Sequence, residues 1–242
     1  MSRLSLLTLL LCFFAPVVRA DHSLDHARLA RELLGPETWA RVIRIENEGR
    51  SRRYPRIVHA LVFELAGVLW FYTDTDGTQS FSLHRNRLEA EKADFAPLLR
   101  DIDPGFTRWT VVPPEPSGAR AGKPLPNGCF VESVAALRHE LAAGAAVQRP
   151  RLLSFYAPAS EGVAGHTVLV FEAGGRTCVV DATPPARTHR FSPRLAGEPL
   201  ELARLLGGPR VVTARWVPIE DWGWRTRVAA TAQPPGSSRP GA

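Results

Sequence analysis

The sequence predicts an α+β protein in which a cysteine begins a helix that packs on an antiparallel sheet. Three observations lead to this prediction. A helical repeat of apolar residues starts at Cys129, two strands joined by Gly174-Gly175 occupy residues 166–183, and a β meander at residues 57–83 precedes both. Helices and strands that are segregated along a chain are typical of the α+β class.

The first 20 residues have the composition of a signal peptide. Arg3 precedes an apolar run from Leu4 to Phe14, and Val18-Arg19-Ala20 offers a small-residue cleavage site. We therefore expect cleavage after Ala20 and a secreted or periplasmic protein. Because the run is about 11 residues long and a bilayer span needs roughly 20, no integral membrane segment is expected.

The charge of the chain is mildly positive. Removal of residues 1–20 takes away two arginines and no acidic residue, which leaves 28 basic and 24 acidic residues and a net charge of +4. The basic residues are nearly all arginine, since lysine occurs only at Lys92 and Lys123. This balance does not favour a nucleic-acid partner, and the run Arg50-Ser51-Arg52-Arg53 is typical of a solvated loop.

Residues 21–112 are expected to form a small N-terminal α+β region. Residues 24–39 predict one or two short helices broken by Gly35-Pro36, and turn residues predict hairpins at 65–68 and 75–78 within the meander. A helix is expected at residues 87–100 and a short strand at 107–112.

The remainder of the chain predicts a linker, a second region and a tail. Residues 113–126 are rich in Pro and Gly and are interpreted as a linker, followed by a region at 127–224. After Asp181 a polar stretch runs to Pro199, and we then expect a helix at 200–206 and a strand at 210–217. Residues 225–242 have the composition of a disordered tail.

The residues around Cys129 indicate the start of a helix. Asn127 is a good N-cap residue, and apolar residues recur at helical spacing from Phe130 to Leu141 until Gly144 ends the pattern. The Cys129 thiol then lies in the first turn, where free amides and the positive end of the helix are expected to lower its pKa. A nucleophilic cysteine requires such a setting.

Residues 166–183 predict a hairpin that brings a histidine and an aspartate together. A two-residue turn at Gly174-Gly175 places Phe171 opposite Cys178, which puts His166 and Asp181 on one face as diagonal neighbours. Cys178 falls on the other face and is expected to be a buried small hydrophobe. A three-residue turn would instead separate His166 from Asp181.

The cysteines allow a second interpretation. Cys12 is lost with the predicted signal peptide, and in an oxidising compartment Cys129 and Cys178 would form a disulfide. The register of the predicted hairpin argues against it.

The chemistry of Cys129, His166 and Asp181 fits a thiol nucleophile, its base and an orienting carboxylate. The backbone amide of Cys129, at the helix start, would bind the developing oxyanion. Taken singly, these residues are better explained as a core cysteine, a hydrogen-bonded strand histidine and a turn aspartate. Their order and predicted convergence favour the chemical interpretation.

The segment from Asn127 to Thr183 resembles the core of papain-like cysteine proteins. It is most similar to their transglutaminase-like branch, of the bacterial transglutaminase-like cysteine peptidase type. There the cysteine opens a helix, a Gly-His pair starts a strand, and the aspartate closes the next strand. The resemblance implies that Cys129 is the nucleophile, His166 the base and Asp181 the orienting acid.

The chain departs from that pattern at two points. Thr167 follows the histidine where an aromatic residue is common, and upstream of Cys129 only Lys123 and Asn127 stand where papain-type members carry a glutamine. Asn127 is therefore the side-chain candidate for the oxyanion site, with the N-cap role as its alternative.

We therefore expect an exported enzyme that performs thiol-dependent acyl transfer on amide bonds of a protein or peptide substrate, with hydrolysis as the default outcome. No cofactor and no metal are expected, since phosphate-loop, HExxH, paired-cysteine and serine-elbow motifs do not occur in the sequence. Two alternatives stay open. One is a non-catalytic binding module of the same fold, and the other is an envelope structural protein that binds partners through the N-terminal meander.

Overall fold

A computed structural model of the chain describes eight segments. The signal peptide predicted at residues 1–20 and the tail predicted at 225–242 lie outside them, as do residues 87–94 of a predicted helix. The described residues are 22–48, 53–65, 67–80, 95–117, 124–160, 162–183, 185–191 and 197–219.

Five strands of the N-terminal region form the first antiparallel sheet. Its strand order is β4-β3-β2-β1-β5. The two predicted hairpins are confirmed, since Leu65 pairs with Val68 and Thr73 pairs with Gly77. The sequence pattern does not predict β1. The strands are β1 (Ala40–Asn47), β2 (Ile57–Leu65), β3 (Val68–Thr73), β4 (Gly77–Ser80) and β5 (Phe106–Val111).

A second antiparallel sheet has the strand order β10-β6-β7-β8-β9. Phe171 lies opposite Cys178, and Ala173 lies opposite Arg176, which confirms the two-residue turn. Gly174 and Gly175 take positive φ values of 56° and 72°, as that turn requires. Strand β9 occupies part of the stretch predicted as polar and irregular. The strands are β6 (Gln148–Ala159), β7 (Gly162–Ala173), β8 (Arg176–Asp181), β9 (Arg187–Phe191) and β10 (Thr213–Pro218).

Four helices accompany the sheets in the described part of the chain. The predicted helix at the cysteine is confirmed, because α4 begins at Cys129 and the left-handed Gly144 (φ 73°) follows its end. The helix predicted at 200–206 is also confirmed. The helices are α1 (His22–Leu34), α3 (Phe95–Ile102), α4 (Cys129–Ala142) and α5 (Pro199–Gly207).

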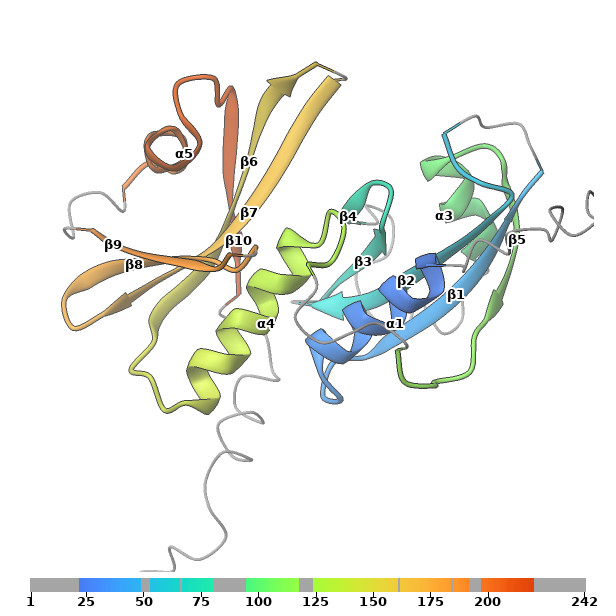
Figure 1. Cartoon of the computed structure of the whole chain (residues 1–242), viewed down its shortest axis with the longest axis horizontal. Coiled ribbons are helices and arrows are strands. Elements are labelled where there is room, and N and C mark those ends of the chain that lie inside the picture. The colour runs from blue at the N-terminus through green and yellow to red at the C-terminus, as the bar shows by residue number, and fades with distance from the viewer. Residues whose placement is uncertain are drawn as a thin grey trace, which may run out of the picture.

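Helices and sheets alternate in layers (Figure 1). Helices α1 and α4 lie between the two sheets, α3 packs on the outer face of the first sheet, and α5 packs on the outer face of the second. The central core contains Leu61 and Phe63 of β2, Ala30 of α1, Val134 of α4 and Leu169 of β7. The regions predicted at 21–112 and 127–224 therefore share one hydrophobic core.

The alternation of side chains along each strand explains these layers. In β2, Leu61 and Phe63 face the central core, while Ala60 and Val62 face α3. Because both faces are covered, β2 is almost continuously apolar. The predicted α+β class is confirmed, with two antiparallel sheets.

Candidate active site

The segment before Cys129 is held by the first sheet. Asn127 adopts a left-handed backbone conformation (φ 52°), and its side-chain Nδ2 donates hydrogen bonds to the carbonyl oxygens of Asp74 (2.8 Å) and Thr75 (3.0 Å). Gly128, not Asn127, occupies the N-cap position, and no side chain caps the helix. The predicted N-cap role of Asn127 is therefore wrong, because contacts with the β3–β4 turn engage its amide.

Tyr72 provides a second attachment for this segment. Its buried hydroxyl donates a hydrogen bond to the carbonyl oxygen of Pro126 at 2.8 Å. Burial raises the pKa of Tyr72, and the nearby groups of Asp74, Glu132 and Cys129 raise it further. The phenol therefore keeps its proton and stays a hydrogen-bond donor.

His166 and Asp181 come together as the hairpin register predicts. His166 Nε2 lies 3.1 Å from Asp181 Oδ2, and the backbone N–H of Thr183 donates to Asp181 Oδ1 at 3.1 Å. The side chains of His166 and Asp181 are 30% and 33% exposed, so the pair is accessible from solvent without being fully hydrated.

Cys129, at the start of α4, lies close to His166. Its influence on the imidazole is the largest one and raises the pKa of His166, to about 9, with a further increase from the Asp181 charge. Burial acts in the opposite direction but is outweighed. The structure thus brings Cys129, His166 and Asp181 close together, with Nε2 of the imidazole on the Asp181 side.

Buried hydroxyls hold α4 beside the strand that carries His166. Ser133 Oγ donates to the carbonyl oxygen of Thr167 at 3.0 Å, and the Thr167 hydroxyl lies 3.0 Å from Ser154 Oγ. All three residues are buried. Thr167, where the resembled family commonly has an aromatic residue, therefore joins β7 to both β6 and α4.

Tyr72, Ser133 and Glu132, which lie near the triad, are not predicted from the sequence. Tyr72 contacts a residue 54 positions away, and no local spacing indicates such a contact. Ser133 and Glu132 follow Cys129 by four and three positions, so they lie on its side of the helix. This helical spacing is the only feature of the sequence that indicates that Glu132 and Ser133 lie near Cys129.

The two described cysteines are free thiols. Cys129 is partly exposed, whereas Cys178 is buried on the opposite face of the hairpin among Leu169, Phe171 and Val180. The disulfide alternative is therefore wrong for this structure, and Cys178 is confirmed as a buried small hydrophobe.

The described segments contain neither a metal-binding cluster nor a membrane-spanning helix. No three His, Cys, Asp or Glu side chains in the described segments cluster so that they could hold a metal ion. Within the same segments, no helix has both the length and the apolar character needed to cross a bilayer.

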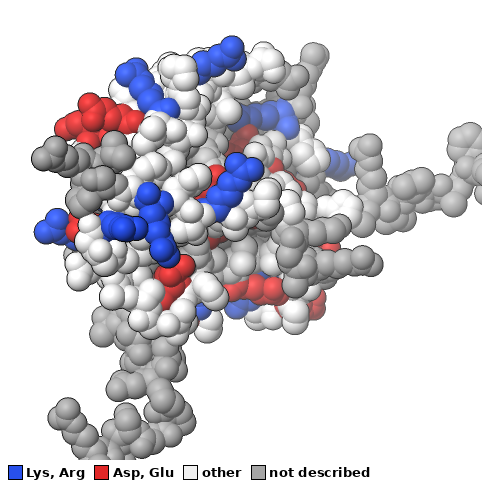
Figure 2. Space-filling model, turned by 60° about the vertical axis from the view of Figure 1, so that its left-hand side comes forward, with Lys and Arg blue, Asp and Glu red and all other residues white. Residues whose placement is uncertain are grey.

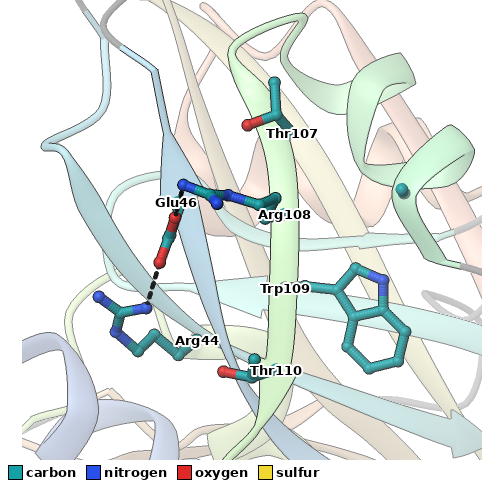
Figure 3. Close-up of a pocket in the computed structure, with 7 residues that line it drawn as sticks. Arg44, Glu46, Thr107, Arg108, Trp109 and Thr110 are labelled. Atoms are coloured by element: carbon teal, nitrogen blue, oxygen red, sulfur yellow. Dashed lines mark hydrogen bonds and ion pairs between the residues drawn. The ribbon is translucent and has the colours of Figure 1, made fainter.

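A separate pocket of about 420 Å³ lies at strand β5 (Figure 3). There Glu46 pairs with Arg44 and Arg108, each at 2.7 Å, and Trp109 points to the other side of the strand. The remaining residues that line it come from α3 and β5, so none of the triad residues contributes.

Surface charge is mixed on the face that includes the second sheet. Figure 2 shows basic and acidic side chains interspersed over this face. The charge pattern seen there fits the mild net charge of the sequence.

The comparisons with known proteins give no relative. The chain matches no protein-family model, and neither curated proteins nor solved structures show a significant similarity to it. The resemblance to papain-like cysteine proteins therefore rests on the residues between Asn127 and Thr183.

Proposed function

We propose that this protein is a cysteine-dependent acyl-transfer enzyme of the papain-like, transglutaminase-like type, which acts on amide bonds of peptides or proteins. The observation that carries the proposal is the position of His166, whose Nε2 contacts Asp181 and whose ring lies close to Cys129 at the start of α4. An imidazole with a raised pKa holds its proton at neutral pH and favours a thiolate at Cys129.

The chemistry follows from these three groups. The Cys129 sulfur forms a bond to the substrate carbonyl carbon, and the carbonyl oxygen takes up the displaced electron pair. As the C–N bond breaks, the His166 imidazolium gives its proton to the departing amine. Water then loses a proton to His166 and attacks the thioester carbonyl carbon, and breakage of the C–S bond releases the acid and regenerates the thiolate beside the protonated imidazole.

The negative charge on the oxygen of the tetrahedral intermediate would be stabilised at the beginning of α4. The first amides of a helix have no intrahelical acceptor, so the backbone N–H of Cys129 is available to a developing oxyanion. We do not assign Asn127 to this role, because its amide already donates to two carbonyl oxygens. Asp181 keeps the imidazole oriented and stabilises its charged form.

Hydrolysis is the default outcome, since water is the commonest acyl acceptor. The proposal includes export of the enzyme, on the basis of the signal peptide predicted at residues 1–20. The test is incubation of the purified protein with a peptide mixture, followed by mass spectrometry. We expect cleaved, deamidated or cross-linked products that disappear in Cys129→Ser. Identical peptide profiles for the two proteins would overturn the proposal.

A non-catalytic binding module of the same fold is the second candidate. The pocket at β5 favours it, because this pocket offers charged groups and is separate from the triad. On this alternative, Cys129→Ser changes no peptide, whereas substitution of Arg44 or Arg108 abolishes capture of a peptide ligand.

A further inference from the structure

Glu132 links the two segments that carry Cys129 and Asp181. It lies three residues after Cys129 on α4, and its Oε1 accepts a hydrogen bond from the backbone N–H of Leu125 at 2.8 Å. Leu125 is itself buried and belongs to the segment that leads into the helix. One oxygen of the Glu132 carboxyl therefore holds the segment that precedes Cys129 against the first turn of α4.

The other oxygen of Glu132 is one of two unpaired buried oxygens in this region. Glu132 Oε2 and Thr183 Oγ1 are both buried, and neither has a partner with hydrogen-bond geometry in the described segments. The Thr183 hydroxyl is nevertheless close enough to lower the pKa of Glu132. Because an unpaired buried oxygen is costly, a single proton shared by these two atoms would satisfy both.

Thr183 completes the connection to the triad through its backbone. Its N–H donates to Asp181 Oδ1, and Asp181 Oδ2 contacts His166. Hydrogen bonds thus join Leu125 to Glu132 and Thr183 to Asp181, and the two pairs each keep one buried oxygen without a partner, Glu132 Oε2 and Thr183 Oγ1.

We propose that Glu132 is a positioning residue of the triad, which fixes the start of α4 relative to the Asp181 turn through Leu125 N–H and the Thr183 hydroxyl. This inference rests on the proposed function. It assigns a role to a carboxyl group that the chemistry of Cys129, His166 and Asp181 does not itself use.

The electrostatic surroundings agree with a hydrogen-bonding role. Burial raises the pKa of Glu132, the Leu125 N–H opposes that change, and the Asp181 charge raises the pKa again. His166 and the Thr183 hydroxyl lower it, and Tyr72 on β3 is the further ionisable group influenced by Glu132. A neutral carboxyl would donate from Oε2 to Thr183 without adding a second negative charge beside Asp181.

The test compares two pairs of variants in the purified protein. Glu132→Gln keeps an acceptor for Leu125 N–H and a donor for Thr183, whereas Glu132→Leu removes both. Thr183→Ser keeps the hydroxyl, whereas Thr183→Val removes it. Glu140→Leu, about two turns further along α4, controls for loss of a helical carboxyl, and circular dichroism verifies folding.

The readout is the rate of Cys129 alkylation by iodoacetamide across pH, with the His166 titration followed by NMR. Glu132→Leu and Thr183→Val should each slow alkylation at least about tenfold and move the His166 titration to lower pH. Glu132→Gln, Thr183→Ser and Glu140→Leu should stay within about threefold of the wild type.

Two results would overturn the positioning role. One is alkylation and titration unchanged in Glu132→Leu and Thr183→Val, and the other is Glu132→Gln being as impaired as Glu132→Leu. Failure of the proposed function looks different, because the wild-type protein itself would then react no faster than an ordinary thiol and would not depend on His166.

Discussion

His166 Nε2 lies 3.1 Å from Asp181 Oδ2, although 15 residues separate them in the chain. The Gly174-Gly175 turn and the alternation of side chains in β7 and β8 bring them together. Asp181 also accepts a hydrogen bond from the backbone N–H of Thr183, and this second contact helps to hold its carboxylate in the orientation that faces the imidazole.

Replacement of Asp181 by Asn should weaken the base. The His166 pKa, raised to about 9 by the nearby Cys129 and by Asp181, should fall, so that the alkaline end of the pH–rate profile moves to lower pH. Turnover should drop roughly 10²- to 10⁴-fold. Asp74→Asn is the matched control, because Asp74 pairs with His26 at 3.0 Å outside the triad. An unchanged profile in Asp181→Asn would contradict the assignment.

Stability should depend on pH through His166. Its pKa rises on folding from the ordinary 6.5 to about 9, so its stabilising contribution is fully present below pH 6.5 and is lost as pH rises through 9. After allowance for partial exposure, the contribution is roughly 1 to 2 kcal/mol. Urea unfolding of the wild type and His166→Ala at pH 6 and pH 10 measures it. A difference that grows at pH 10 would have the wrong sign.

Removal of the Tyr72 hydroxyl should loosen the segment before Cys129. Tyr72→Phe leaves the Pro126 carbonyl oxygen without its 2.8 Å donor and should lower the free energy of unfolding by about 1 to 2 kcal/mol. Tyr54→Phe is the control, since the buried Tyr54 hydroxyl has no hydrogen-bond partner among the described residues. Chemical denaturation should show loss of stability in Tyr72→Phe alone, and equal effects would argue against a specific contact.

Gly77 should tolerate no side chain. A Cβ at this position would lie 2.8 Å from the Asn127 carbonyl oxygen, and its φ of 75° is strained for other residues. Gly144→Ala shares the positive φ (73°) but meets no atom within 4 Å, so it isolates the backbone strain of about 1 kcal/mol. Gly77→Ala should be less stable than Gly144→Ala in thermal unfolding and should slow Cys129 alkylation. Equal rates would show that the β3–β4 turn does not position the cysteine.

Local patterns predicted the elements that carry the triad. The Gly174-Gly175 turn fixed the β7–β8 register, and the apolar spacing after Cys129 fixed the helix, because both signals lie within a few residues. Strands β1 and β6 were not predicted. In β1, Arg44 and Glu46 alternate with Ile43 and Ile45, but Gly35-Pro36 is interpreted as a break within a helical segment rather than as the turn that precedes a strand.

The contacts that hold the segment before Cys129 are long-range and could not be predicted from local sequence patterns. Asn127 is favourable as an N-cap, yet the carbonyls of Asp74 and Thr75 bind its amide and leave Gly128 at that position. Likewise, the hydrogen bond of Tyr72 joins segments that only the packed sheets bring together. Such contacts depend on the tertiary fold, to which propensity is a weak guide.

The reactivity of Cys129 across pH is the most direct test of the proposed thiolate–imidazolium pair. Wild type, Cys129→Ala, His166→Ala and Cys178→Ala would be treated with a thiol-reactive probe between pH 5 and pH 10, and the labelled residue identified by mass spectrometry. We predict fast labelling near pH 6 that requires Cys129, slows in His166→Ala and is unchanged in Cys178→Ala. Slow labelling that increases only near the ordinary thiol pKa of about 8.5, with or without His166, would contradict the account.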